Sequence, residues 1–122
     1  MIVEALVSLS LAQAAIRPQT PSYIDPYPVE SLAVVMGELH AIAFACEGRG
    51  SQTWRNAMLE LLQHEAPTRG TYRDRLTQRF NEGFRARERR RVRCGAEAEL
   101  ERAALAERGQ VLAEQLRRTY LE

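Results

Sequence analysis

Residues 29–50, VESLAVVMGELHAIAFACEGRG, decide the fold. The apolar side chains of this stretch recur three, four and seven positions apart, which is the spacing of one face of an α-helix. They are Leu32, Val35, Met36, Leu39, Ala43 and Cys46. Pro28 stands where the first turn of a helix tolerates proline, and Gly48-Arg49-Gly50 supplies a stop. The stretch therefore predicts an amphipathic helix of about four turns or more.

The same helical spacing continues through the rest of the chain. It predicts further helices from about Ser51 to Pro67, from Gly70 to about Cys94, and from about Ala96 to Tyr120. The sequence has no stretch that alternates with a period of two and no Asn-Gly or Asp-Gly turn, so no strand is expected. Short connections favour antiparallel neighbours, and residues 29–122 are therefore expected to form an all-α, antiparallel four-helix bundle-like domain.

Length and composition limit the class of protein. The 122 residues suit one domain with a core of its own. Hydrophobic residues make up 45% of the chain and charged residues 27%, which excludes a wholly disordered tail and an integral membrane protein. The 17 basic and 16 acidic residues give a formal net charge of +1, so the molecule as a whole does not attract nucleic acid by charge.

Residues 1–14 have the composition of a secretory leader. The run Ile2–Ala15 is too short to span a bilayer, which takes about 20 residues, and Ala12-Gln13-Ala14 has the small-x-small pattern of a cleavage site. Residues 15–28 contain four prolines and predict an extended Pro-rich linker. We expect export to the periplasm with no transmembrane anchor after cleavage. A leader normally begins with positive charge, whereas the charge here is Glu4, so a start further upstream and an apolar helix packed on the domain are the alternatives.

The two cysteines provide a test of the expected topology. In an up-down-up-down bundle the first and third helices run parallel, so Cys46 and Cys94 meet at the same end. A disulfide needs Cα atoms within about 7 Å, and closing a loop of this length stabilises the fold by roughly 4 kcal/mol. In a reducing cytosol the same residues would be two inert buried thiols. The leader favours the bridge.

No residue cluster in the sequence defines a reaction or a metal site. His64-Glu65 begins a zinc-helix pattern, but Thr68 stands where the second histidine is needed. A hydrolase that used His40 and Glu65 as an acid–base pair would lack a nucleophile. His40 borders the apolar stripe, so we expect a half-buried, hydrogen-bonded side chain rather than a general base, with contact to a partner as the alternative. We expect no enzyme, no cofactor and no bound metal.

Two other places have both a structural and a binding interpretation. Trp54 and Arg55 begin the second predicted helix, where a tryptophan fills the end of a bundle or contacts a partner. Asn81 and Gly83, followed by Phe84, interrupt the third predicted helix with residues of low helix propensity. A glycine there lets another helix approach closely or lines a shallow groove.

Residues 85–93 are the most basic part of the chain. They hold six arginines against Glu88 alone, a local charge of 6 − 1 = +5; the arginines are Arg85, Arg87, Arg89, Arg90, Arg91 and Arg93. We expect them to be solvated and paired internally with Glu97, Glu99 and Glu101 of the next helix. The alternatives are binding to anionic lipid headgroups or another envelope polyanion and, below these, binding to nucleic acid, for which interleaved aromatic residues are missing.

An ordered set of short motifs resembles a known family. The motifs are Met36-Gly37-Glu38-Leu39-His40, Cys46-Glu47-Gly48, Trp54-Arg55, Glu65-Ala66-Pro67, Phe80-Asn81, Gly83-Phe84-Arg85, Cys94 and Arg118-x-Tyr120. Their order is similar to that of a small alphaproteobacterial family of exported helical proteins with an N-terminal leader, two cysteines and no assigned function. The resemblance covers about residues 32–120 and implies a cysteine-paired envelope protein without catalytic residues. This chain departs from the family in the missing positive start and in the arginines of residues 85–93.

The leading hypothesis is therefore a non-enzymatic periplasmic protein that binds or scaffolds another envelope protein or an anionic envelope component. The candidate partner-binding residues are His40, Trp54, Arg55, Asn81, Phe84, Arg85, Arg89, Arg90 and Arg91. The alternative is a cytosolic nucleic-acid-binding module that uses residues 85–93.

Overall fold

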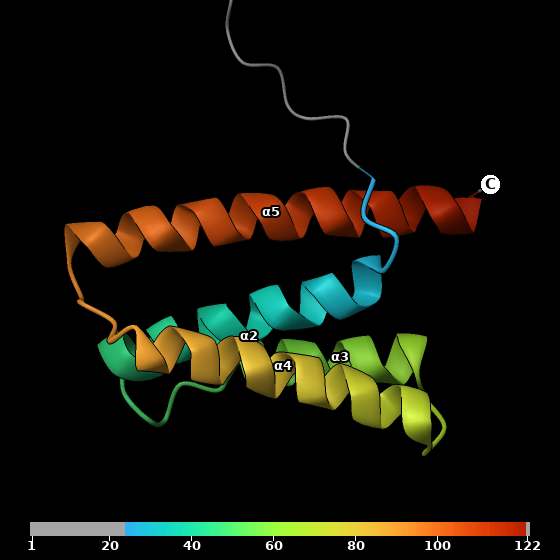
Figure 1. Ribbon diagram of the computed structural model, residues 1–122, viewed down its shortest axis with the longest axis horizontal. Coiled ribbons are helices and arrows are strands. Elements are labelled where there is room, and N and C mark those ends of the chain that lie inside the picture. Colours follow the sequence, from blue (N-terminus) through green and yellow to red (C-terminus); the bar gives the residue numbers. More distant parts are fainter. Residues whose placement is uncertain (1–23, 122) are drawn as a thin grey trace, which may run out of the picture.

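One helix, α2, lies at the centre of the molecule. The computed structural model describes residues 24–121, which form α2 (Pro28–Glu47), α3 (Thr53–Glu65), α4 (Thr71–Arg89) and α5 (Ala96–Leu121) (Figure 1). The predicted all-α fold with four packed helices is confirmed. The predicted leader, residues 1–14, and residues 15–23 of the predicted linker lie outside the described residues.

Successive helices alternate in direction, and α2 runs parallel to α4, as the sequence predicted (Figure 1). α2 packs against each of the other three helices, whereas no Cα atom of α5 lies within 8 Å of a Cα atom of α3 or α4. The helices therefore form layers, with α5 on one side of α2 and with α3 and α4 on the other (Figure 1). This differs from a square bundle, in which each helix packs against two neighbours.

Two glycines bring α2 and α4 into backbone contact. A Cβ atom on Gly37 would lie 1.9 Å from the carbonyl oxygen of Phe80, and a Cβ atom on Gly83 would lie 2.1 Å from the carbonyl oxygen of Val34. Cβ atoms do not approach other atoms so closely, so glycine alone fits at either position without a shift of the helices. The prediction that Gly83 lets another helix approach is confirmed.

α2 contributes to two core clusters. On the side of α3 and α4 the buried residues are Val29, Ala33, Met58, Leu62, Ala66, Leu76 and Phe80. On the side of α5 they are Leu32, Val35, Leu39, Ile42, Ala98, Leu105 and Leu112. The stripe of large apolar residues predicted in α2 is mainly the α5 side. The opposite side contains the small residues Ala33, Gly37 and Ala41. A pattern of large apolar side chains does not reveal such a face.

Burial on both sides explains why α2 is apolar around most of its circumference. By length and composition, α2 is apolar enough to cross a membrane. The core helix of a soluble protein passes the same test, and 56% of the apolar stretch is buried against the rest of the molecule. Packing against three helices therefore accounts for its composition without a membrane.

Asp25 fixes the segment that precedes α2. Its carboxylate accepts hydrogen bonds from the Ser31 hydroxyl at 2.6 Å and from the backbone N–H of Tyr27 at 2.8 Å. Its backbone N–H donates to the side-chain oxygen of Gln115 at 3.2 Å, and the Gln115 amide donates to the Asp25 carbonyl at 2.6 Å. Residues at the end of the predicted linker are therefore docked on α5.

Candidate functional site

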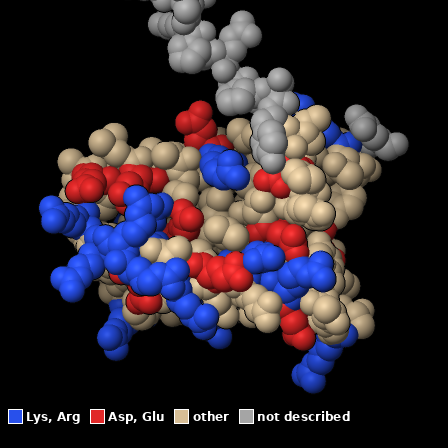
Figure 2. Space-filling model, viewed as in Figure 1, with Lys and Arg blue, Asp and Glu red and all other residues tan. Residues whose placement is uncertain are grey.

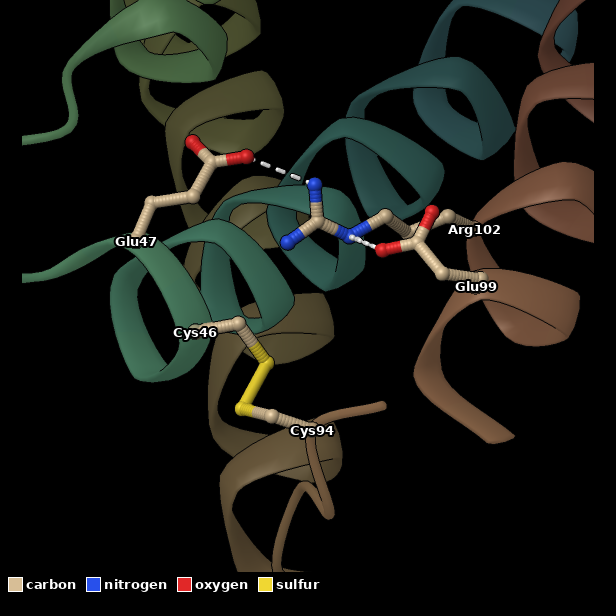
Figure 3. The surroundings of a disulfide bond; sticks show 5 residues. All are labelled: Cys46, Glu47, Cys94, Glu99 and Arg102. Atoms are coloured by element: carbon tan, nitrogen blue, oxygen red, sulfur yellow. Dashed lines mark hydrogen bonds and ion pairs between the residues drawn. A yellow bond between two sulfur atoms is a disulfide. The ribbon is translucent and has the colours of Figure 1, made fainter. Parts of the chain in front are cut away.

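A disulfide joins the end of α2 to the turn between α4 and α5. Cys46 lies in the last turn of α2 and Cys94 follows α4, and their Cα atoms are 5.5 Å apart (Figure 3). The predicted pairing of the two cysteines is confirmed. One detail of the prediction is wrong, because α4 ends at Arg89 and Cys94 belongs to the turn rather than to the helix.

Ion pairs from Arg102 reinforce the same end. Its guanidinium lies 2.7 Å from the Glu47 carboxylate in α2 and 3.7 Å from the Glu99 carboxylate in its own helix (Figure 3). The hydrogen bond from Arg102 and its positive charge lower the pKa of Glu47. A covalent bond and an ion pair thus hold the end of α2 against both the turn and the first part of α5.

Arg87 is buried where α2, α4 and α5 meet. Only 9% of the residue is exposed, and its guanidinium donates to Glu38 of α2 and to Glu101 of α5, each at 2.9 Å. Two carboxylates on different helices therefore compensate one buried charge. The sequence marked Arg87 as one of six similar arginines, although its role in the fold is distinct.

The other five arginines of residues 85–93 differ from Arg87. They are exposed and form no ion pair with any residue that the structure describes: Arg85, Arg89, Arg90, Arg91 and Arg93. The predicted solvation is confirmed, and the predicted pairing with the glutamates of α5 is wrong for these five. Because α4 ends at Arg89, the later arginines lie in a turn and not on a helix face opposite the glutamates. Figure 2 shows basic side chains gathered at this end of the molecule, where Figure 1 places the turn.

His40 lies within the helix packing. It is 8% exposed, and its ring centroid is 5.6 Å from that of Phe80 and 5.3 Å from that of Phe84. Burial, and then the charge of Arg55, lower the pKa of His40. Its Nδ1 atom has no hydrogen-bond partner among the described residues. The expectation of a half-buried, hydrogen-bonded histidine is therefore wrong, and the neutral ring behaves as part of the core.

The remaining candidates do not gather in one place. Trp54 is partly buried and packs against the α5-side cluster, while Arg55 beside it is exposed. Phe84 is partly buried in the aromatic group around His40. Asn81 is exposed on α4, where it lines an open surface depression with Arg85. The structure thus separates an aromatic group in the interior from a basic surface at one end.

The expected pairing of residues 85–93 with Glu101 is confirmed for Arg87. Three other residues that build this end escaped the sequence interpretation, namely Glu38, Glu47 and Arg102. Their partners are far apart along the chain, and no local pattern indicates which charges meet. Among residues 24–121 there is no group of three or more His, Cys, Asp and Glu side chains that could hold a metal ion.

Comparison with known proteins identifies a family. Residues 26–120 match a family described as "Protein of unknown function (DUF2385)". Neither a curated protein nor a solved structure matches the chain. The matched residues include both cysteines and all of the described structure except residues 24, 25 and 121.

Proposed function

Given that the chain belongs to the DUF2385 family, we propose that it is an exported, periplasmic protein without enzymatic activity that binds or scaffolds another component of the cell envelope. The resemblance of its sequence motifs to those of exported alphaproteobacterial proteins is part of this proposal. Its partner is another envelope protein or an anionic envelope component.

Two independent features support export. Both cysteines of the chain take part in the Cys46–Cys94 bridge, and such bridges persist in oxidising compartments such as the periplasm. The apolar run of residues 2–15 with its small-x-small pattern is the second feature.

The observation that carries the binding role is a set of arginines on a fixed backbone that form no ion pair with any residue from 24 to 121. We call the exposed residues Arg85, Arg89, Arg90, Arg91 and Arg93 the basic end. Their guanidinium groups are free to bind carboxylates or phosphates, which arginine recognises through its planar fork of donors. The disulfide and the Arg87 ion pairs hold the backbone beneath them, which lowers the entropy lost when a partner binds.

Fractionation of the native cell tests export. We expect the protein in the periplasmic fraction, with an intact mass that lacks the leader and with no free thiol. Protein that retains Met1 and carries two free thiols in the cytoplasm would contradict the proposal.

Cross-linking in the envelope fraction tests the binding role. The oxidised chain is compared with the triple variant Arg89→Gln, Arg90→Gln, Arg91→Gln, which removes three positive charges from the basic end. A matched control, Arg69→Gln, Arg117→Gln, Arg118→Gln, removes the same charge elsewhere. We expect the triple variant alone to lose a specific cross-linked partner. Salt-sensitive DNA binding that only the triple variant loses would instead favour the cytosolic alternative.

A further inference from the structure

The turn between α4 and α5 borders a pocket of about 260 Å³. We call it the turn pocket, and its lining residues are Arg87, Arg90, Arg91, Val92, Arg93, Glu97 and Glu101. A liquid water molecule occupies about 30 Å³, so the turn pocket has the volume of several water molecules. This is more than a bare phosphate ion needs and leaves space for an attached group.

The lining of the turn pocket has a surplus of positive charge. Four arginines and two glutamates give 4 − 2 = +2. Arg87 is compensated by Glu101 and also by Glu38 outside the lining, each at 2.9 Å, which lowers the surplus to 2 − 1 = +1. Like charges gathered in one concave site repel each other, and a bound anion relieves this repulsion. An anion with one or two negative charges therefore balances this surplus.

The backbone of the turn pocket is fixed in a conformation that arginine rarely adopts. Arg91 has φ of +52°, in the left-handed region, and its N–H donates to the Glu88 carbonyl at 3.0 Å. Non-glycine residues adopt this region at an energetic cost, and they cluster at functional sites. The disulfide at Cys94 anchors the chain three residues later. Arg87 also lines the turn pocket, and its buried Nε atom has no hydrogen-bond partner among the described residues.

We propose that the turn pocket binds a phosphate group, either as free phosphate or on a phosphorylated lipid headgroup. Phosphate carries up to two charges at neutral pH and several acceptor oxygens, so it can accept hydrogen bonds from more than one guanidinium at once. The inference deepens the proposed function, on which it rests, by naming the chemistry that the basic end recognises.

Calorimetric titration of the oxidised full chain with inorganic phosphate tests the pocket. Vesicles of phosphatidic acid in phosphatidylcholine, compared with phosphatidylcholine alone, test the lipid source.

The pocket variant Arg90→Gln, Arg93→Gln is compared with Arg117→Gln, Arg118→Gln, which removes the same charge from the far part of α5. Circular dichroism confirms that both variants fold. We expect the pocket variant to bind at least about tenfold more weakly, and the control to stay within about twofold of the wild type.

A third variant, Arg85→Gln, Arg89→Gln, separates a built pocket from a diffuse charge effect, because neither residue lines the turn pocket. We expect it to lose less affinity than the pocket variant. Equal losses in the two variants, or no phosphate binding by the wild type, would overturn the inference. If phosphate binding is absent while the envelope cross-link still depends on the basic end, the pocket inference fails and the proposed function stands. If phosphate binds as expected but the protein remains cytoplasmic with free thiols, the proposed function fails instead.

Discussion

α4 and α5 flank α2 on opposite sides and are held there in different ways. α4 touches α2 backbone to backbone at Gly37 and Gly83, where no Cβ atom fits. α5 meets α2 through side chains, and a Cβ atom on Gly109 would lie 3.6 Å from a Val35 methyl group, an ordinary contact distance. The α4 side thus has no room for a side chain at these two glycines, whereas the α5 side has room for a methyl group.

Polar contacts do not distinguish the two helices in the same way. α5 is tied to the rest of the molecule near both of its ends, by Arg102 to Glu47 and by Gln115 to Asp25. α4 also has an ion pair with α2 near each end, Arg75 to Glu30 at 3.6 Å and Arg87 to Glu38 at 2.9 Å, and adds the close backbone packing at its middle. Substitutions that add volume should therefore damage the α4 side more than the α5 side.

The largest effect we expect comes from the bond that both sides share. Replacing Cys46 and Cys94 by alanine frees a loop of 48 residues and should lower the free energy of unfolding by about 4 kcal/mol. Both core clusters remain, so the helical signal in circular dichroism should persist at room temperature. Urea denaturation of the variant and of the reduced wild type should give similar losses. A much smaller loss in both would show that the bridge does not constrain the unfolded chain.

The next effect separates the two sides of α2 directly. Gly83→Ala places a methyl group against the Val34 carbonyl and should cost about 2–3 kcal/mol, because the helices must move apart. Gly109→Ala, the same change in α5, should stabilise the protein by up to about 1 kcal/mol through helix propensity. Urea denaturation with the disulfide intact measures both. Equal effects of the two substitutions would remove the distinction between the two sides.

The sequence predicted the helices and the cysteine pair because both follow from local spacing and simple topology. It did not predict the central place of α2, because the stripe of Ala33, Gly37 and Ala41 lacks the large apolar residues by which a core face is recognised. The end of α4 was also missed. Arginine is a good helix former, so propensity favoured a helix up to Cys94, whereas the chain leaves the helix after Arg89 and reaches a left-handed Arg91.

The sequence predicted the positive charge of residues 85–93 but not which of their arginines is buried and which are exposed. Which arginine is buried depends on Glu38 and Glu101, which lie 49 and 14 residues away from Arg87 along the chain. The sequence predicted Glu101 as a partner of this run, but the pair with Glu38 arises from the packing of three helices and leaves no mark in a local pattern. The division into one structural arginine and five exposed ones therefore required the structure.

Removing that structural arginine affects both sides of α2. Arg87→Gln leaves the carboxylates of Glu38 and Glu101 without their cation, and these side chains are only 23% and 31% exposed. We expect a loss of about 2 kcal/mol, less than for a fully buried pair because water reaches both carboxylates. Arg79→Gln, which removes an exposed ion pair with Glu82, should lower the stability much less than Arg87→Gln, because water screens exposed pairs. Thermal denaturation compares the two, and equal losses would contradict the role of Arg87.

The smallest effect is a pH dependence that arises on the α4 side, where His40 contacts Phe80 and Phe84. Its pKa in the folded protein lies below the ordinary value of 6.5. As the pH falls through 6.5, the unfolded chain takes up a proton at this position that the folded chain resists. The unfolded state then binds more protons, so the free energy of unfolding decreases until the pH passes below the lowered pKa.

His40→Leu should remove this slope, because leucine does not titrate and leaves no unpaired Nδ1 atom in the packing. Urea denaturation at several pH values between about 7.5 and 5.5, where most carboxyl groups stay ionised, measures it. His64→Gln is the matched control, because His64 is exposed and its removal should leave the slope unchanged. A slope that persists in His40→Leu and disappears in His64→Gln would show that the pH dependence does not arise from the ring buried against α4.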